Sequence, residues 1–422
     1  MTVTGRTGPA KFWSSPPLIP RPGGWPPVPA AEIEERIRRF QVSLTEAGIN
    51  VAILVQNSDL FYFTGTIQQG QLLIPASGEP VYLVRKDLER ARRESPLPNL
   101  RPIESLRELP AALAGMGVPP TAVVGMELDV IPVGLFRRYD SLFRQGEVRD
   151  CSPLIRQLRA VKSSYELALI GEAAQIVDLG VWAAVDALRE GMTELELSAR
   201  VEAGMRAAGQ GIVRFRAFNE ELPFGNVSAG PSAAMPGFSG MPLTAAGPSA
   251  ATGQSAGWHR IQRGEPVVVD MVGCAGGYLA DQTRILCLGP LPEDMAEGYR
   301  LCVEVQEWVR HAAKPGVACG ELYELAVDYM AERLRASALR ATFMGAPKNE
   351  VPYIGHGLGV ELDELPVLAR GFKSVLERDQ VIACEPKLVF PERGVVGIEN
   401  TWRVTETGLQ CLTLSPQAVL EV

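Results

Sequence analysis

The first third of the chain alternates between helical and strand-like hydrophobic spacing. Residues 31–47 predict an amphipathic helix closed by Gly48. Its apolar residues recur at intervals of three and four: Ile33, Ile37, Phe40 and Leu44. Short apolar runs at 51–55, 80–84 and 122–125 are typical of buried strands, and helical stretches separate them. This alternation predicts an α/β domain over residues 31–160.

A second pattern begins near residues 158–163, where we place the domain boundary. Residues 164–188 form a long amphipathic pattern with Leu167, Ile170 and Val177 on one face. A capping box, Thr193 to Glu196, starts the next predicted helix. These helices open a second domain, predicted to extend over residues 161–422.

Residues 215–257 are rich in Gly, Pro, Ser and Ala, which predicts a long loop or a lid. Strands are expected at 267–270 and 279–288, joined by a turn over Cys274 to Gly277. Two further helices are expected at 292–313 and 320–334. The remaining segments are strand-like, so the second domain combines α and β elements.

Length and composition are compatible with two globular domains. The chain has 422 residues, 46% of them hydrophobic, and a formal net charge of −8. Lys and Arg form no clustered basic surface in the sequence, so a nucleic-acid partner is not expected. The seven cysteines are scattered and form no C-x-x-C pair, which indicates a reduced, cytoplasmic protein.

No membrane partner is expected, because no stretch of about 18 apolar residues runs uninterrupted. The N-terminus also lacks the apolar core of a signal peptide. Residues 1–30 instead form a proline-rich arm, which excludes helix and favours extended chain. Either this arm is a disordered tail, or Trp13 and Trp25 dock it on its own or a partner subunit.

Five candidate metal ligands stand in the C-terminal part of the chain, each next to an apolar or glycine-rich segment. They are Asp270, Asp281, His356, Glu385 and Glu399. An aspartate in the run from Val267 to Val272 would be costly to bury without a partner. The predicted hairpin can bring Asp270 and Asp281 together, and glycines flank His356, which permits close approach of the backbone.

Four carboxylates and one imidazole suit two divalent cations. Carboxylate oxygen favours Mn or Mg, whereas a single imidazole also admits Zn, Co or Fe. Without metal, converging carboxylates would raise one another's pKa values. Two cations roughly 3.5–4 Å apart would remove this repulsion and hold a bridging hydroxide at neutral pH. The implied chemistry is attack by a metal-activated water.

The five motifs, in this order, resemble those of the pita-bread metallohydrolases, the superfamily of creatinase, prolidase, aminopeptidase P and methionine aminopeptidase. The resemblance extends over nearly the whole chain beyond residue 30. It implies a creatinase-like N-terminal α/β domain at 31–160 and a pita-bread catalytic domain at 161–422. It also implies a homodimer in which the N-terminal domain of one subunit helps to close the other's active site.

The resemblance also implies roles for the residues. Asp281 and Glu399 would bridge two ions, of which Mn is the first choice and Co, Zn or Fe are alternatives. Asp270 would complete the coordination of one ion, and His356 and Glu385 would complete that of the other. Glu385 would serve as general base, while Thr283 and Arg284 match a D-x-T-R pattern and would brace the site. A purely structural role for Arg284 is equally compatible.

Three positions depart from the Xaa-Pro peptidases of this superfamily. Gly237 and Asp363 stand where histidines are expected, and Gly397 stands where an arginine is expected. At these three positions, the basic side chains that would bind a peptide carbonyl are therefore replaced by neutral or acidic residues. Asp363, which we include among the catalytic candidates, would favour a cationic or amine-bearing substrate. On this hypothesis, Asp363→His raises turnover of Xaa-Pro dipeptides.

The function expected from these features is a dinuclear metallohydrolase of the Xaa-Pro dipeptidase or aminopeptidase type, acting on a short peptide. One alternative is a hydrolase or lyase that acts on a small, cationic metabolite with the same metals. The other is a binding protein that has lost catalysis. Cys384 adjoins Glu385, but strand alternation points it away from the metals, so a buried structural thiol is expected.

Overall fold

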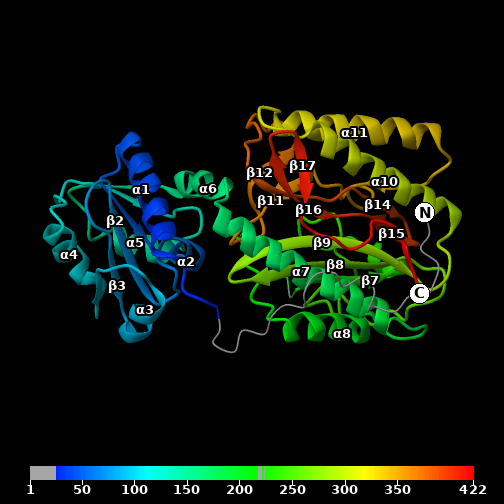
Figure 1. The fold of residues 1–422 in the computed structure, drawn as a ribbon, viewed down its shortest axis with the longest axis horizontal. Coiled ribbons are helices and arrows are strands. Elements are labelled where there is room, and N and C mark those ends of the chain that lie inside the picture. The colour runs from blue at the N-terminus through cyan, green and yellow to red at the C-terminus, as the bar shows by residue number, and fades with distance from the viewer. Residues whose placement is uncertain (1–24, 217–220, 223) are drawn as a thin grey trace. The chain divides into compact units, whose positions relative to one another are not determined.

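The computed structural model describes residues 25–216, 221–222 and 224–422, and these divide into two compact units (Figure 1). Of the described residues, the smaller unit contains 25–159 and Arg216, and the larger contains Ala160–Phe215 and those beyond 220. The mixed α and β content agrees with the predicted fold class. Most of the proline-rich arm lies outside the described residues.

A six-stranded mixed sheet with strand order β4-β3-β2-β1-β5-β6 forms the centre of the smaller unit. The predicted helix is present as α1 (Ala30–Glu46), and its four predicted apolar positions are buried. The strands are β1 (Val51–Leu54), β2 (Gly70–Pro75), β3 (Val81–Val84), β4 (Leu100–Pro102), β5 (Val123–Met126) and β6 (Glu147–Asp150). The other helices are α2 (Asn57–Thr64), α3 (Leu88–Glu94), α4 (Leu109–Gly115), α5 (Val133–Asp140) and α6 (Ser152–Ala160).

The smaller unit buries a network of charged groups as well as an apolar core. Asp59, fully buried, accepts hydrogen bonds from Arg159 and Arg216, each at 2.8 Å. Arg216 also pairs with Asp129. Glu127, fully buried, accepts from the backbone N–H groups that follow β1. Burial, reinforced by the nearby Asp59, raises the pKa of Glu127 to about 8.

The larger unit contains a four-stranded sheet of order β18-β9-β8-β7, formed by β7 (Gly225–Ala229), β8 (Val267–Ala275), β9 (Tyr278–Cys287) and β18 (Leu420–Glu421). The helices α7 (Ser164–Ala187) and α8 (Glu194–Ala207) lie along it (Figure 1). Helix α7 alone is long and apolar enough to span a membrane by length and composition, among the described residues. Because it packs on β8 and β9, its apolar residues are those of a core helix.

Two further sheets complete this unit, with orders β12-β11-β13-β16-β17 and β10-β14-β15. Their strands are β10 (Thr342–Phe343), β11 (Tyr353–Gly357), β12 (Glu364–Ala369), β13 (Val381–Cys384), β14 (Lys387–Phe390), β15 (Gly394–Gly397), β16 (Asn400–Thr405) and β17 (Gly408–Cys411). The helices α10 (Glu293–Ala312) and α11 (Cys319–Ala336) pack against them. Both helices agree with the predicted ranges to within two residues.

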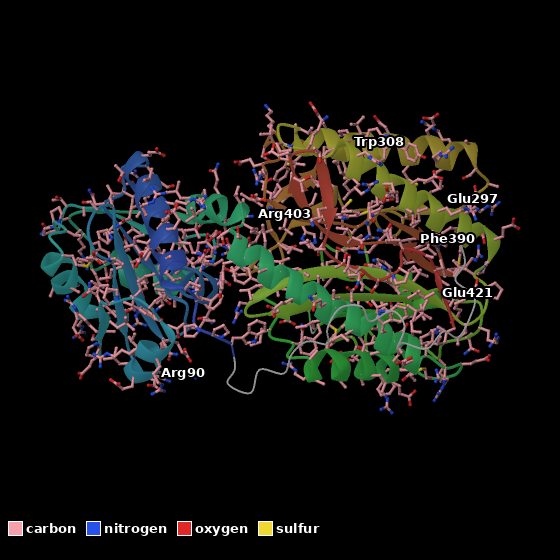
Figure 2. The ribbon with its side chains drawn as sticks, viewed as in Figure 1. Arg90, Glu297, Trp308, Phe390, Arg403 and Glu421 are labelled. Carbon is pink, nitrogen blue, oxygen red and sulfur yellow. The ribbon has the colours of Figure 1, made fainter. Side chains whose placement is uncertain are left out.

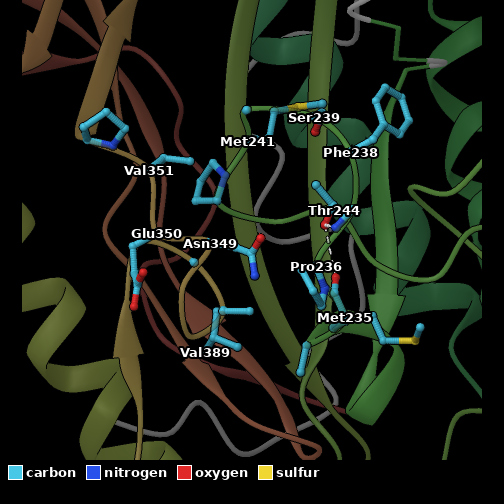
Figure 3. Close-up of a pocket in the computed structure, with 18 residues that line it drawn as sticks. Met235, Pro236, Phe238, Ser239, Met241, Thr244, Asn349, Glu350, Val351 and Val389 are labelled. Atoms are coloured by element: carbon cyan, nitrogen blue, oxygen red, sulfur yellow. Dashed lines mark hydrogen bonds between the residues drawn. The ribbon is translucent and has the colours of Figure 1, made fainter.

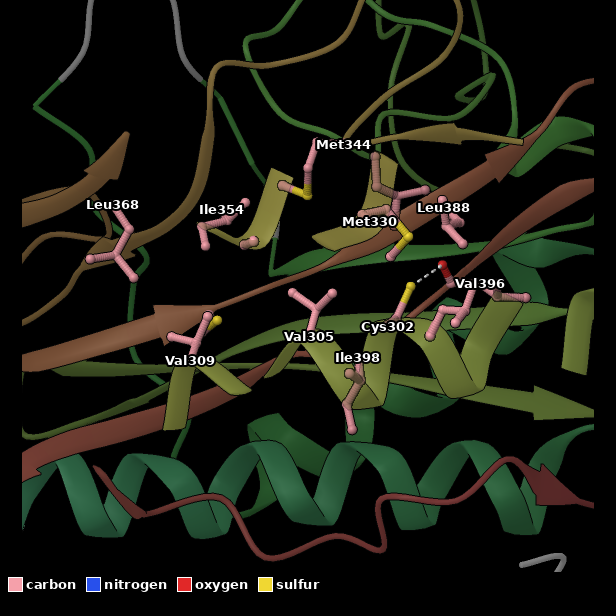
Figure 4. Packing of buried hydrophobic residues seen from close by; sticks show 14 of the residues in the cluster. Cys302, Val305, Val309, Met330, Met344, Ile354, Leu368, Leu388, Val396 and Ile398 are labelled. Carbon is pink, nitrogen blue, oxygen red and sulfur yellow. Dashed lines mark hydrogen bonds between the residues drawn. The ribbon is translucent and has the colours of Figure 1, made fainter. Parts of the chain in front are cut away.

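The main apolar core of the larger unit lies between α10 and these sheets. Val305 and Val309 of α10 are buried with Leu388 and Ile398 (Figure 4). Gly298 brings α10 so close to β14 that a Cβ there would lie 2.9 Å from the ring of Phe390. Phe390 of β14 is buried, whereas Trp308 of α10 is 39% exposed; both are labelled in Figure 2. This packing fixes β14 and β15, the two strands that lie between Glu385 and Glu399 along the chain.

The prediction of a continuous loop at 215–257 is wrong in part. Within it, β7 pairs with β8, with Asn226 opposite Asp270, and the short helix α9 (Gly230–Ala233) follows. The segment was misread because its small residues suppress the strand pattern, whereas the pairing partner β8 supplies the hydrogen bonds. The structure therefore places β7 as an edge strand beside a predicted ligand.

Candidate metal centre

The hairpin of β8 and β9 carries the two aspartates on one face. Asp270 lies opposite Thr283, and Asp281 lies opposite Val272. Asp281 and Thr283 are two residues apart on β9, so all three polar side chains share a face of the sheet. The turn is Gly276-Gly277, with φ of 55° and 89°, a backbone conformation that glycine adopts without strain. The register therefore places the two aspartates on the same face of the hairpin.

Glu385 and Glu399 face each other across adjoining strands. Cys384 pairs with Asn400 on one side of them, and Lys387 pairs with Gly397 on the other. This common register sets Glu385 opposite Glu399, and both side chains are buried. His356 enters from β11, where it pairs with Ala383 of β13. The structure thus brings together all five predicted residues. They come from the β8–β9 hairpin, from β11, and from the residues that follow β13 and β15.

The imidazole of His356 is held in an orientation suited to metal binding. Its Nδ1 lies 2.9 Å from the carbonyl oxygen of Leu362 and 3.1 Å from that of Gly357. Carbonyl oxygens only accept, so Nδ1 carries the proton and Nε2 keeps a free lone pair. Nε2 lies 3.8 Å from Glu385 Oε1 and 4.0 Å from Glu399 Oε1. The free lone pair therefore faces two carboxylates.

Three of the five residues form a compact set that can hold one ion. Ligand atoms of Asp281, His356 and Glu399 all lie within 4.8 Å of one another, and all three residues are buried. Oε1 of Glu399 is buried and has no hydrogen-bond partner. A buried carboxylate oxygen without a partner is costly, and a cation would satisfy it. The donor chemistry at this position fits a divalent metal.

A lysine that was not among the predicted site residues lies between the remaining carboxylates. Nζ of Lys387 lies 2.5 Å from Glu385, 3.1 Å from Glu399 and 3.2 Å from Asp270, and the side chain is 1% exposed. A signal was available: Lys387 is two residues beyond Glu385 in a strand-like segment, so both point to the same face. The Asp270 and Glu385 side of the site thus already contains one positive charge.

Gly397 makes room for the lysine stem. It lies directly opposite Lys387 in the β14–β15 pair. A Cβ at position 397 would lie 2.6 Å from Cγ of Lys387 and 2.7 Å from the carbonyl oxygen of Pro386. Any side chain there would displace the lysine or the strand. The absence of an arginine at 397 and the presence of a lysine at 387 are therefore structurally linked.

Burial and mutual repulsion raise the pKa values of the acids. Desolvation raises the pKa of Asp270 to about 6, although Lys387 opposes the shift. Desolvation also raises the pKa of Asp281 well above its usual range, and Glu399 and Asp270 add to the effect. Burial alone would lower the pKa of His356, but the surrounding carboxylates raise it. Ionisation of all these acids together is therefore unfavourable in the buried site unless a cation offsets their charge.

Thr283 and Arg284 support the cluster in different ways. Thr283 Oγ1 donates a hydrogen bond of 2.8 Å to Oε2 of Glu399 and so orients this carboxylate. Arg284 is fully buried and donates to the carbonyl oxygen of Glu399 and to Oδ1 of Asn400. Thr283 therefore touches a predicted ligand, whereas Arg284 fixes the strand that carries it.

The other predicted residues lie around the centre or outside it. Asp363 Oδ1 lies 3.6 Å from Nδ1 of His356, and its side chain is 50% exposed. Cys384 is buried in the apolar core, as expected. Of the two histidines that were not candidate ligands, His311 is exposed, and His259 is partly exposed and lies 2.9 Å from Glu265.

A cavity of about 350 Å³ lies beside α9 and β14. Met235, Phe238 and Met241 line one side, and Asn349 and Glu350 the other (Figure 3). Gly237 also lines it, and a Cβ there would lie 2.7 Å from Thr244. None of the five predicted ligands lines this cavity, so Gly237, where a histidine was expected, faces a separate space.

Comparison with known proteins identifies the larger unit. The model of metallopeptidase family M24 matches residues 168–406, more than half of the chain. The chain belongs to metallopeptidase family M24. The model of the creatinase/prolidase N-terminal domain matches residues 36–161. The chain is thus a metal-dependent peptidase of this family, and both parts of the predicted fold are confirmed.

Relatives of this M24 peptidase extend over nearly its whole length. It is 26% identical over 390 residues to the Xaa-Pro dipeptidase of Pyrococcus furiosus, which covers 92% of this chain and 100% of the relative. The crystal structure of the prolidase from Pyrococcus horikoshii OT3 is 26% identical, with a TM-score of 0.75 over 90% of this chain and 99% of that one. The X-Pro aminopeptidase of Thermotoga maritima, 23% identical, shares the fold with a TM-score of 0.76, over 92% of this chain and 99% of that one.

Proposed function

We propose that this M24 peptidase hydrolyses short peptides near their N-terminus, with Xaa-Pro dipeptides as the first substrates to test. The convergence of Asp281, His356 and Glu399 around a free Nε2 and an unpartnered Oε1 carries the proposal. The relatives named Xaa-Pro dipeptidase support the substrate class.

A divalent cation held by Asp281, His356 and Glu399 would supply Lewis-acid chemistry, with Mn as the first candidate and Co, Zn or Fe as alternatives. Glu385 is the proposed general base. Its Oε2 accepts from Lys387, while Oε1 faces His356 Nε2 at 3.8 Å. Oε1 is therefore the atom placed to receive a proton beside the ion.

The acidic rim favours substrates that carry an amine. Asp363 is half exposed next to His356, so its carboxylate can meet a solute that approaches the ion. A free N-terminal ammonium is the matching group on a peptide. This argument also retains a small amine-bearing metabolite as a second substrate class, because a carboxylate at 363 recognises the amine and not the peptide bond.

The experiment is hydrolysis of a dipeptide panel by the Mn-loaded protein. We expect release of proline from Xaa-Pro dipeptides with a free N-terminus and a loss of at least ~100-fold for His356→Ala, because a metal ligand is removed. His311→Ala, an exposed histidine, is the matched control and should keep full activity. Equal rates for His356→Ala and the unaltered protein, or turnover only of amine metabolites, would refute the peptide assignment.

We also propose that the protein acts as a homodimer in a reducing, cytoplasmic compartment. All seven cysteines are free thiols, and six of them are buried, which suits a compartment without disulfide formation. The mass in solution tests the dimer, and fractionation of the native cell tests the location.

A further inference from the structure

The ammonium of Lys387 fills the part of the site that a second metal ion would need. An ammonium group has three N–H donors, and three carboxylate oxygens lie within 3.2 Å of Nζ. They belong to Asp270, Glu385 and Glu399 and come from three different segments. Every donor of this buried lysine therefore has a partner, and the lysine is a satisfied part of the site.

The remaining donors define a single, separate cation position. Asp281, His356 and Glu399 supply ligand atoms within 4.8 Å of one another. The oxygen of Glu399 that faces His356 is Oε1, which has no partner, whereas Oε2 accepts from Lys387 and Thr283. The two oxygens of one carboxylate are thus divided between an ion position and the ammonium.

A second ion between Asp270 and Glu385 would compete directly with the lysine. It would need Oδ2 of Asp270 and Oε2 of Glu385, the atoms nearest to Nζ. It would also meet a positive charge at contact distance in a site sheltered from water, where Coulomb repulsion is strong. The lysine stem is confined as well, since Gly397 leaves room for it and the side chain is 1% exposed.

We infer that Lys387 is a built-in cation that replaces one of the two metal ions expected here, so that each chain binds one divalent ion at Asp281, His356 and Glu399. This inference rests on the proposed metal-dependent function. It revises the expectation of a dinuclear site. Asp270 and Glu385 then hold the ammonium instead of a second ion.

Metal stoichiometry tests the inference without any activity measurement. Full-length protein is saturated with Mn²⁺, freed of excess ion and analysed for Mn per chain, and its electron paramagnetic resonance spectrum is recorded. We expect one Mn per chain with the spectrum of an isolated ion. Lys387→Met keeps a long stem without the charge and should bind two, with spin coupling. Lys314→Met, an exposed lysine, should remain at one.

Ligand variants give a second, independent measurement. Asp281→Asn or His356→Ala should reduce Mn to below 0.1 per chain, whereas Asp270→Asn should remain at one, because Asp270 contacts the ammonium. Two Mn per chain in the unaltered protein, or a loss of half the Mn in Asp270→Asn, would overturn the inference. One Mn per chain without dipeptide hydrolysis would instead support it and count against the proposed function.

Where Lys387→Met folds poorly, Lys387→Arg is the second variant. Arginine retains the positive charge, so we expect one Mn per chain for this variant. Thermal unfolding with and without Mn²⁺ adds a readout for both. The rise in Tm on adding Mn²⁺ should be larger for Lys387→Met than for the unaltered protein. Without the ammonium, the charge of the carboxylates around position 387 is neutralised by metal ions alone. An equal rise would contradict the inference.

Discussion

At the residue scale, single hydrogen bonds decide what each acid can do. Glu399 has one oxygen held by Thr283 and Lys387 and the other without a partner. His356 is fixed through Nδ1, so that only Nε2 is available. These constraints turn two flexible side chains into oriented ligands, which lowers the entropic cost of binding an ion.

Thr283→Val should weaken metal binding by ~10–100-fold, because it removes the donor that orients Glu399 while keeping the side-chain shape. Titration calorimetry with Mn²⁺ measures the affinity. Thr407→Val, at an exposed threonine, is the matched control and should bind as the unaltered protein does. An unchanged affinity in Thr283→Val would show that the hydroxyl does not orient the ligand.

At the element scale, the sequence pattern predicted the long helices, the β8–β9 hairpin and the buried strands β1, β3 and β5, and it missed other short strands. Helices α1, α7, α10 and α11 have strong helical periodicity, and the β8–β9 hairpin has a Gly-Gly turn. Strands β4 and β6 are short and partly exposed, and β7 consists of small and polar residues. Their positions depend on pairing partners distant in sequence, which local patterns do not record.

The residues of the candidate metal centre, like the elements of the fold, were predictable only in part. Four acids and an imidazole were recognisable because each interrupts an apolar or glycine-rich run. Lys387 was missed because a lysine on a strand is usually read as solvent-facing. Its burial depends on Gly397 in the neighbouring strand, and this pairing is known only from the fold.

Gly397→Ala tests the close approach of β14 and β15. The new Cβ would meet Lys387 and the carbonyl of Pro386, so we expect a loss of ~1–3 kcal/mol in the free energy of unfolding of the larger unit. Gly171→Ala in α7, where a Cβ meets nothing within 4 Å, should be neutral or stabilising. Urea denaturation compares them, and equal stability of the two variants would exclude the steric conflict.

At the scale of the whole molecule, the two units are stabilised by different cores. The smaller unit has its own apolar cluster around β1, β2 and β5, whereas the larger unit packs α10 and α11 against the sheets of the metal centre. Two separate cores need not unfold in one transition. A substitution in the smaller unit should therefore shift one unfolding transition. A change in metal loading should shift the transition of the larger unit.

Glu127 gives the smaller unit a distinct pH dependence. Its pKa is about 8 in the folded chain and is usually 4.5, so the folded state binds the extra proton between these values. The stabilisation is complete below pH 4.5 and is lost as pH rises through 8. Glu127→Gln cannot lose this proton, so its smaller unit should lose less stability from pH 5.5 to pH 8.5.

Urea unfolding at these two pH values, followed by a probe in the smaller unit, measures this difference. Glu79→Gln, at an exposed position, should keep the pH dependence of the unaltered protein. Because the metal centre lies in the other unit, its own titration affects all three proteins equally. The same loss of stability in Glu127→Gln and the unaltered protein would mean that Glu127 is already ionised in the fold, held by the backbone N–H groups after β1 and by Arg216.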